Sequence, residues 1–267
     1  MIESTGEGQA IDEQEALKRL EQRHDASDRY YAAWWLGHER SRHPRTLPLL
    51  KTALGELFET TSPPNDDCRA LSLNVLRALA HLDGSKAETE ILACLTHSDQ
   101  QIREEAARTA AAASLHKAIA PLCASLSNTS THNDRLLEAQ IEALGELAKP
   151  SETIIELLTP FTDSEKPLIR SAANRALLQI TDDSSWSNAF QALVQHPSAQ
   201  VRRGVLLDIG AVGWLPSLTM IQTSAVENSI KLIALRGLAE HPRGLVAAGV
   251  SEQEACNLVL SAMDALL

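Results

Sequence analysis

Aromatic side chains are scarce in this sequence of 267 residues: there are nine, or 3% of the chain. Alternating runs of Val, Ile and Thr, which are typical of half-buried strands, are missing, whereas Ala and Leu are abundant. No apolar run approaches the roughly 18 residues of a membrane span, and the first residues are polar and acidic, unlike a leader peptide. We therefore expect an all-α protein that is soluble and cytoplasmic.

Positive charge is also in short supply, because 24 Lys and Arg stand against 35 Asp and Glu, giving a net charge of -11. This balance disfavours non-specific nucleic-acid binding, which requires a basic surface. The four cysteines lie far apart without a Cys-x-x-Cys pair, so neither a metal site nor a disulfide framework is predicted. The sequence also lacks a Gly-rich phosphate loop, His-Glu-x-x-His and Gly-x-Ser-x-Gly, so no familiar catalytic constellation is found.

Four of the nine aromatic residues are concentrated between residues 28 and 37. The intervening Ala and Leu residues suit a packed helix. Tyr30 and Trp34, four residues apart, are predicted to stack on one exposed helical face. Tyr31 and Trp35 occupy positions that carry Ala or Leu elsewhere in the chain, so we assign them to the core.

This stretch is the first copy of a repeat of about 33 residues. Most copies begin with a cation or polar residue, continue with Ala-rich packing and reach an apolar residue seven positions later. The copies are Arg29–Leu36, Ser72–Leu79, Arg103–Ala110, Leu137–Leu144, Arg170–Leu177, Arg202–Ile209 and Lys231–Leu238. A second apolar-periodic segment precedes each copy: Gln14–Arg23, Thr46–Glu59, Ala87–Thr96, Ala118–Leu126, Glu152–Phe161, Trp186–Gln195 and Leu215–Thr223.

Two helices per unit with a leading Val/Ile-Arg pair are typical of HEAT-like repeats. The sequence thus predicts a right-handed α-solenoid of about seven helix pairs with a closing helix in Ser251–Leu267. Residues 11–267 would form one domain after a disordered segment 1–10, and residues 61–67 would form a loop. Asp99, Asp134 and Ser151 are expected N-caps, and Gly84, Gly213 and Gly244 are expected helix stops.

The second helices of such a solenoid line its concave face, where a ligand or partner would bind. Positions one and five residues after the leading cation carry Tyr30, Trp34 and five arginines: Arg77, Arg108, Arg175, Arg203 and Arg236. Because arginine binds carboxylates and an aromatic platform stacks on conjugated rings, these residues predict a flat ligand with carboxylates. The alternative is that these arginines serve solubility and ion pairs between helices.

Asp208 stands where most repeats carry Ala, so we expect an inward or half-buried carboxylate beside Arg203 and consider it a candidate acid. The leading cations are interpreted as structural, bound to Asp or backbone groups of the neighbouring repeat. They are Arg29, Arg103, Arg170, Arg202 and Lys231.

Three segments, Arg29–Gly37, Val201–Pro216 and Glu227–Leu238, resemble the larger subunit of the heterodimeric E/F-type phycobilin lyases of cyanobacteria. The likeness runs from about Ile11 to about Glu240 with all repeats in order. It implies an enzyme subunit that pairs with a smaller HEAT-repeat subunit, the F-type partner. Such a pair attaches an open-chain tetrapyrrole through a thioether to a cysteine of a phycobiliprotein α subunit.

The resemblance further implies phycocyanobilin as substrate, rather than a permanently bound cofactor, and phycocyanin α as acceptor, with localisation near phycobilisomes. A bilin is flat and carries two propionates, which agrees with the ligand inferred from Tyr30, Trp34 and the arginines. Asp208 or Glu104 would protonate the ring system or hold its pyrrole N–H groups. The nucleophile would belong to the acceptor protein.

Two other interpretations remain open at this point. A non-catalytic HEAT-repeat bilin carrier, or a phycobilisome assembly or disassembly factor, would share the groove without needing a small partner. A plain protein-interaction scaffold would need neither Tyr30 nor Trp34.

Overall fold

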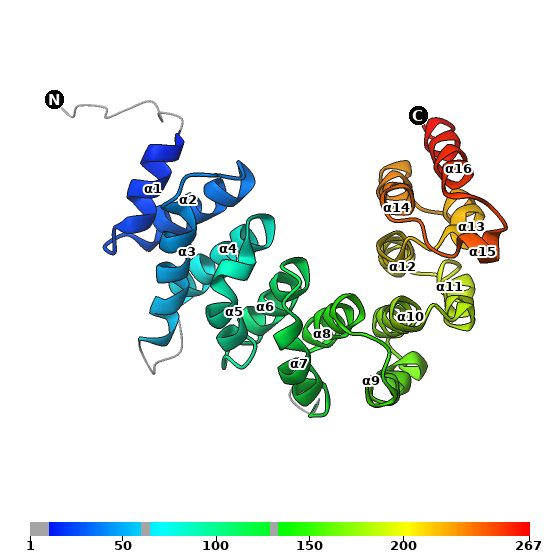
Figure 1. The fold of residues 1–267 in the computed structure, drawn as a ribbon, viewed down its shortest axis with the longest axis horizontal. Coiled ribbons are helices and arrows are strands. Elements are labelled where there is room, and N and C mark those ends of the chain that lie inside the picture. The colour runs from blue at the N-terminus through cyan, green and yellow to red at the C-terminus, as the bar shows by residue number, and fades with distance from the viewer. Residues whose placement is uncertain (1–10, 60–64, 129–132) are drawn as a thin grey trace. The chain divides into compact units, whose positions relative to one another are not determined.

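The computed structural model describes residues 11–59, 65–128 and 133–267 (Figure 1). Contacts within the chain divide it into two compact units, unit 1 with residues 1–122 and unit 2 with residues 123–267. The disorder predicted for residues 1–10 and part of the loop predicted at 61–67 lie outside the described residues. That residues 11–267 form one domain stays a prediction.

Unit 1 is built from three helix pairs, in each of which a short first helix precedes a longer second helix (Figure 1). The first helices are α1 (Glu13–Glu21), α3 (Thr46–Gly55) and α5 (Glu88–Cys94). The second helices are α2 (Ala26–His38), α4 (Asp66–His81) and α6 (Gln100–Ala112). Short 3-10 helices connect them: η1 (Glu56–Phe58), η2 (Gly84–Ala87) and η3 (His116–Ala118).

Unit 2 continues the pattern after α7 (Ile119–Leu126), which crosses the boundary between the units. Its other first helices are α9 (Glu152–Leu158), α11 (Asn188–Leu193) and α13 (Leu218–Thr223). Its second helices are α8 (Asp134–Leu147), α10 (Pro167–Thr181), α12 (Ala199–Val212) and α14 (Asn228–Glu240). The 3-10 helices are η5 (Thr159–Asp163), η6 (Ser184–Ser187) and η7 (Leu215–Ser217), and the chain ends with α15 (Leu245–Ala248) and α16 (Glu252–Asp264).

The predicted all-α solenoid of seven helix pairs with a closing helix is confirmed. Within each unit the second helices pack side by side in one layer, α2 on α4 on α6 and α8 on α10 on α12 on α14, and α16 extends that layer beyond α14. No strand occurs in the described part of the chain. None of its helices is long and apolar enough to cross a membrane.

Helix ends follow the local chemistry of the sequence, with some corrections. Asp99 and Ser151 cap α6 and α9 as predicted, whereas the cap of α8 is Asn133 and not Asp134. The Asn133 carboxamide oxygen accepts the backbone N–H of Leu136 at 2.8 Å. Gly213 ends α12 in the left-handed conformation as predicted, but Gly244 precedes α15 and Gly84 begins η2.

The leading cations fasten each second helix to the end of the first helix, where backbone carbonyls lack helical partners. The bonds run from Arg29 to the Leu20 carbonyl, from Arg103 to His97, from Arg202 to His196 and from Lys231 to Gln222, at 2.7–3.1 Å. Arg29 and Arg202 also reach Glu56 and the Ala225 carbonyl of the next pair. A structural role is therefore confirmed for these four, but the predicted bond to a neighbouring repeat is found only for Arg29 and Arg202, since Arg103 and Lys231 bind within their own helix pair. The Arg170 side chain has no partner among the described residues.

Small residues allow the second helices to approach closely. A Cβ built on Gly37 of α2 would lie 2.6 Å from the Cα of Ala78 in α4. A Cβ on Gly210 of α12 would likewise lie 2.6 Å from the Cα of Ala234 in α14, and Gly237 faces the Gly210 backbone in turn. Real Cβ contacts below 3.0 Å essentially do not occur, so no larger residue fits at these crossings.

Gly210→Ala is expected to destabilise unit 2 by about 2 kcal/mol, because the new methyl group must push α12 and α14 apart. Gly55→Ala is the matched control: it lies at the end of α3 with nothing within 4 Å of a built Cβ. It is expected to stabilise the chain by about 0.5 kcal/mol, since Ala costs less helical entropy than Gly. Urea unfolding measures both changes, and equal midpoints for the two variants would contradict the close approach.

Candidate functional site

An exposed aromatic stack runs along α2 in unit 1. The Tyr31 and Trp34 rings lie 5.5 Å apart between centroids, and the Trp34 and His38 rings lie 5.0 Å apart, both with nearly parallel planes. Tyr31 and Trp34 are 43% and 44% exposed, so two large aromatic rings remain partly in contact with solvent instead of being buried. Exposed stacked rings of this kind offer a face to a planar ligand.

The predicted exposure in this stretch was right for Trp34 and wrong for Tyr30 and Tyr31. Tyr30 is half-buried and Tyr31 is exposed, whereas we expected Tyr30 on the surface and Tyr31 in the core. A helical residue shares its face with the residues three and four positions before and after it. Trp34 can therefore share its face with Tyr31 and His38 as readily as with Tyr30. Applying both spacings would have selected Tyr31 and His38.

Every arginine predicted on the second helices of unit 1 is paired with a carboxylate. Arg77 of α4 binds Glu105 of α6 at 3.0 Å, and Arg108 binds Glu104 at 2.6 Å one turn earlier in α6. Both arginine side chains are about half exposed, at 53% and 41%. Glu104, a predicted catalytic residue, is thus held in an ion pair at the surface of α6.

Unit 2 contains a buried charge network centred on Arg175 of α10. Its guanidinium lies 3.3 Å from Glu142, 2.5 Å from Glu146 and 3.3 Å from Asp208, and its side chain is 9% exposed. Asp208 of α12 also accepts a hydrogen bond from the Ser171 hydroxyl at 2.5 Å. Arg175 is therefore not the exposed groove residue that we predicted.

Asp208 is buried as expected, but its partner was predicted wrongly. It faces Arg175, while Arg203 points to α14 and binds Glu227 with two hydrogen bonds. The hydrogen bonds from Arg203 lower the pKa of Glu227 to about 2. The partner was missed because residues on adjacent helices meet by helix packing, which spacing within one repeat does not reveal.

Burial dominates the electrostatics of Asp208. Desolvation raises the pKa of this carboxyl above its usual value, and Arg175 and Ser171 offset only part of the rise. The pKa of Arg175 is also raised: burial acts against its charge, but the carboxylates of Asp208, Glu142 and Glu146 outweigh it. With 4% exposure, Asp208 can touch a ligand only if its surroundings move.

A shallow cavity of about 300 Å³ opens between α12 and α14. Its floor includes Gly210 and Gly237, and its rim carries Leu207 and Ile233, which are 40% and 55% exposed. Arg236 lies at the same rim, paired with Glu240 at 2.8 Å and 72% exposed. Exposed apolar side chains beside an accessible cation suit a flat ligand with a carboxylate.

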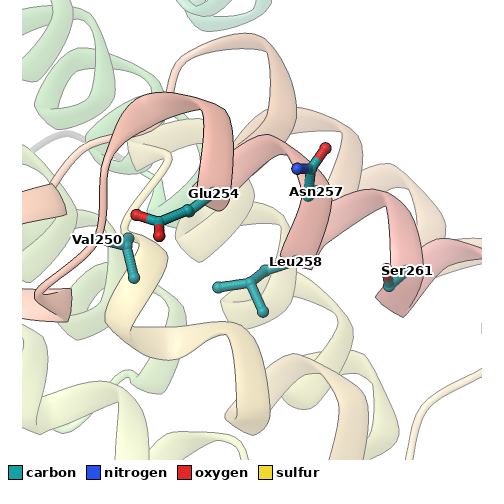
Figure 2. Close-up of a pocket in the computed structure, with 5 residues that line it drawn as sticks. All are labelled: Val250, Glu254, Asn257, Leu258 and Ser261. Carbon is teal, nitrogen blue, oxygen red and sulfur yellow. The ribbon is translucent and has the colours of Figure 1, made fainter.

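A second cavity lies along α16 in unit 2 (Figure 2). Figure 2 shows Glu254, Asn257, Leu258 and Ser261 on α16, with Val250 just before it. Glu254 accepts the backbone N–H of Ser251 at 2.8 Å and thereby closes the capping box of the helix. Its carboxylate is thus committed to the helix end, and the cavity offers a ligand little charge.

The cysteines provide no activated nucleophile in the described structure. Burial raises the pKa of Cys94 to about 12 and also raises that of Cys123, so both thiols stay protonated at neutral pH. Cys68 is exposed and Cys256 is half-buried. In the described part of the chain, no group of three or more His, Cys, Asp or Glu side chains could hold a metal ion.

Comparison with known proteins settles the family. The chain is 41% identical to the "Bilin biosynthesis protein RpcE" of Synechococcus sp. (strain WH8020), over 96% of both chains. It is 35% identical to the "Phycocyanobilin lyase subunit alpha" of Synechocystis sp. (strain PCC 6803), over 95% of both. The chain belongs to the phycocyanobilin lyase α-subunit family.

The solved structures agree with this assignment. The lyase subunit matches a chain of the complex of CpcE and CpcF of phycocyanin lyase from Nostoc sp. PCC7120, with a TM-score of 0.80 and 30% identity. The match covers 98% of this chain and 97% of that one. No protein-family model matches the sequence. The resemblance inferred from three sequence segments is therefore confirmed over nearly the whole length.

The Arg175 network predicts unequal costs for its two central members. Arg175→Gln is expected to lower the free energy of unfolding by about 3–5 kcal/mol, because it leaves Asp208 buried without its cation. Asp208→Asn is expected to lower the free energy of unfolding by less than about 1 kcal/mol, since Arg175 keeps its ion pairs with Glu142 and Glu146. The raised pKa of Asp208 also indicates that Arg175 and Ser171 compensate its ionised form only in part. Urea unfolding of both variants at neutral pH provides the measurement.

The pH dependence gives an independent check on Asp208. Because its pKa is higher in the folded chain than in the unfolded one, its contribution to stability is full below pH about 4 and declines as pH rises through the folded pKa. The wild type should therefore lose stability relative to Asp208→Asn as pH rises above about 4. A gap between the two proteins that stays constant with pH would refute this account.

Proposed function

We propose that this chain, paired with a smaller lyase subunit, attaches phycocyanobilin by a thioether bond to a cysteine of a phycobiliprotein α subunit, with phycocyanin α as the acceptor. The observation that supports it best is the near-full-length match to a chain of the CpcE and CpcF complex. Relatives named as phycocyanobilin lyase α subunits support the same activity.

The reaction is an addition, so it needs no oxidant and releases no leaving group. The thiol sulfur bonds to the bilin ethylidene carbon, the double bond opens, and the thiol proton ends on the adjoining carbon. Holding bilin and thiol together is worth up to about 7–11 kcal/mol of the barrier when the geometry is right. We assign this chain chiefly that positioning role.

The acceptor protein supplies the sulfur in this proposal. Cys94 and Cys123 of the lyase subunit have raised pKa values, which disfavour the thiolate that adds to a double bond. Exposed Cys68 lies in the first turn of α4, with its backbone N–H bound by the Asn65 side chain and no partner cation shown for its thiol. A nucleophile from outside the chain fits these environments.

The aromatic stack on α2 is the part of the surface best suited to the bilin plane. Among the arginines first predicted to bind the propionates, Arg77, Arg108, Arg203 and Arg236 are accessible but each binds a carboxylate of the chain. Exposed ion pairs contribute little stability, so a propionate could replace such a carboxylate at small cost. Arg175 would have to leave a buried network and is a poor candidate.

Proton donation by Asp208 or Glu104 stays a prediction. Glu104 is the more accessible of the two, with a side chain 15% exposed against 6% for Asp208. Asp208→Asn that ligates like the wild type would remove Asp208 as the acid, and Glu104→Gln tests the other carboxylate in the same way. Both substitutions keep the side-chain volume but also remove the charge that pairs with Arg108 or Arg175, so loss of activity reports the proton only if urea unfolding shows the variant to be as stable as the wild type.

Co-expression tests the proposal. The chain is produced with a smaller lyase subunit, a phycocyanin α subunit and a supply of phycocyanobilin, and covalent bilin fluorescence is scored after denaturing electrophoresis. A fluorescent acceptor band that requires both lyase chains is the expected result. Bilin retained by this chain without any labelled acceptor would instead favour a carrier.

Trp34→Ala is expected to weaken bilin binding about tenfold, because it removes the central ring of the stack. Tyr31→Ala should act in the same direction, and Tyr30→Ala should have the smaller effect because Tyr30 lies outside the stack. Absorbance titration with free phycocyanobilin measures all three.

Phe58→Ala is the matched control for these variants, since Phe58 is an exposed aromatic residue of the same unit at 45% exposure. It contacts His97 edge-on and does not join the α2 stack. Equal losses for Phe58→Ala and Trp34→Ala would show that the effect is general and would argue against the α2 stack as the bilin platform.

A further inference from the structure

A cavity of about 460 Å³ in unit 1 brings cationic side chains together in an otherwise acidic protein. It lies where the loop after α2 meets the end of α4 and is lined by Arg40, Arg42, His43 and His81. Apolar side chains, among them Leu47 and Leu82, complete the wall. This volume falls in the range of small-molecule sites, roughly 300–1,000 Å³.

The arginines of this cavity are unusual because their side chains bind no other group in the described part of the chain. Of the 17 arginines, four have side chains without a hydrogen-bond or ion-pair partner among the described residues. Two of these four, Arg40 and Arg42, line the same cavity. The other two, Arg135 and Arg170, stand in the first turns of α8 and α10 in unit 2.

His43 adds a hydrogen-bond donor to the two cations. Its Nδ1 accepts the backbone N–H of Arg45 at 3.2 Å, so the neutral ring carries its proton on Nε2. The carboxylate lining the cavity is Asp83, which accepts the Ser85 hydroxyl at 2.5 Å. Glu13 lies nearby and accepts the Ser41 hydroxyl at 2.6 Å. The lining thus holds two arginines and one carboxylate, and neither arginine side chain is paired with Asp83 or Glu13, which leaves capacity for an anion.

The backbone at Arg40 adopts a conformation that favours glycine, although the residue there is arginine. Arg40 has φ 51°, in the left-handed region, and ends α2 with bonds from its N–H to Gly37 and from the Ser41 N–H to Leu36. Glycine is the residue best suited to this position of a Schellman motif. The sequence instead places a long cation at this strained position, where it lines the cavity.

The same helix carries the aromatic stack. The stack ends at His38, and Arg40 follows two residues later, so at most about 7 Å of chain separates their Cα atoms. A bilin combines a planar conjugated body with two flexible propionates. An aromatic platform followed closely by two unpaired arginines matches both parts of such a ligand.

We propose that this cavity binds the propionate carboxylates of the bilin while its rings lie toward Trp34, an inference that rests on the function proposed above. Arg40 and Arg42 supply the charge, and His43 donates from Nε2. The arginines of the second helices, which already bind carboxylates of the chain, would then not be the principal propionate ligands.

The test compares phycocyanobilin with its dimethyl ester, which keeps the rings and removes both charges. Titration of the full chain, alone and with the smaller subunit, should show that the free acid binds more tightly than the ester. Arg42→Ala and Arg40→Gly should each weaken binding of the free acid about tenfold and leave binding of the ester unchanged.

Arg40→Gly separates binding from folding, since glycine relieves the left-handed strain and should raise the thermal midpoint. Ser114→Gly is its matched control: Ser114 has φ 54° and ends α6 with the same pair of backbone bonds, from Ser114 to Ala111 and from Leu115 to Ala110. It should raise the midpoint without changing bilin binding. Arg135→Ala and Arg170→Ala control for loss of an unpaired arginine elsewhere.

The proposal is overturned if the double variant Arg40→Gly, Arg42→Ala binds the free acid as the wild type does. It is also overturned if that variant keeps bilin binding but loses the smaller subunit in gel filtration, because the cavity would then be a protein contact. Ligation by the wild-type pair is scored separately: ligation unaffected by the double variant leaves the proposed function standing without this site. Charge-dependent bilin binding through the two arginines, without ligation by any pair, would support the site and overturn the lyase activity.

Discussion

The close approach of neighbouring second helices is the constraint on which the rest of each unit depends. Gly37 against Ala78 and Gly210 against Ala234 leave no room for a larger side chain at the crossings. The close approach of α12 and α14 brings their exposed side chains within reach of one another, which is why Arg203 pairs with Glu227 across them. Arg77 of α4 pairs with Glu105 of α6 across the next packed pair of second helices in unit 1. The ion pairs of the surface are thus a consequence of the packing beneath it.

That consequence decides which cations remain for a ligand. Most arginines on the helix faces of this acidic chain bind a carboxylate, as Arg77 and Arg203 do, although Arg135 and Arg170 have no side-chain partner among the described residues. Arg40 and Arg42 lie in the loop after α2, line one cavity and likewise have no side-chain partner in the described part of the chain. Burial divides the paired arginines further: Arg77 and Arg236 could exchange partners with a ligand, whereas Arg175 is enclosed with three carboxylates.

The helical architecture could be predicted from the sequence because the repeat sets both the period and the apolar face of each helix pair. The burial of Asp208 followed from its Ala-like position in the repeat in the same way. Predictions failed where a shift of one residue changes the outcome, since adjacent positions on a helix differ in direction by about 100°. Tyr31 therefore took the place assigned to Tyr30, and the cap assigned to Asp134 belongs to Asn133. The partner of Asp208 lies 33 residues away on another helix, and only the packing of α10 on α12 reveals it.

A lyase subunit of this kind supplies little chemistry of its own, and its side chains reflect that. The predicted acids are paired, Glu104 with Arg108 and Asp208 with Arg175, and the buried Cys94 thiol is held protonated by its high pKa. The protonated Cys94 thiol is a poor nucleophile, and each carboxylate would have to leave its ion pair to act on a substrate. What the described structure does offer is an aromatic face on α2, followed by two arginines without side-chain partners, which under the proposed function would restrict how a bilin can lie. Under that proposal, restricting the bilin would raise the effective concentration of its reactive carbon at an incoming thiol, and binding geometry would be the principal source of rate.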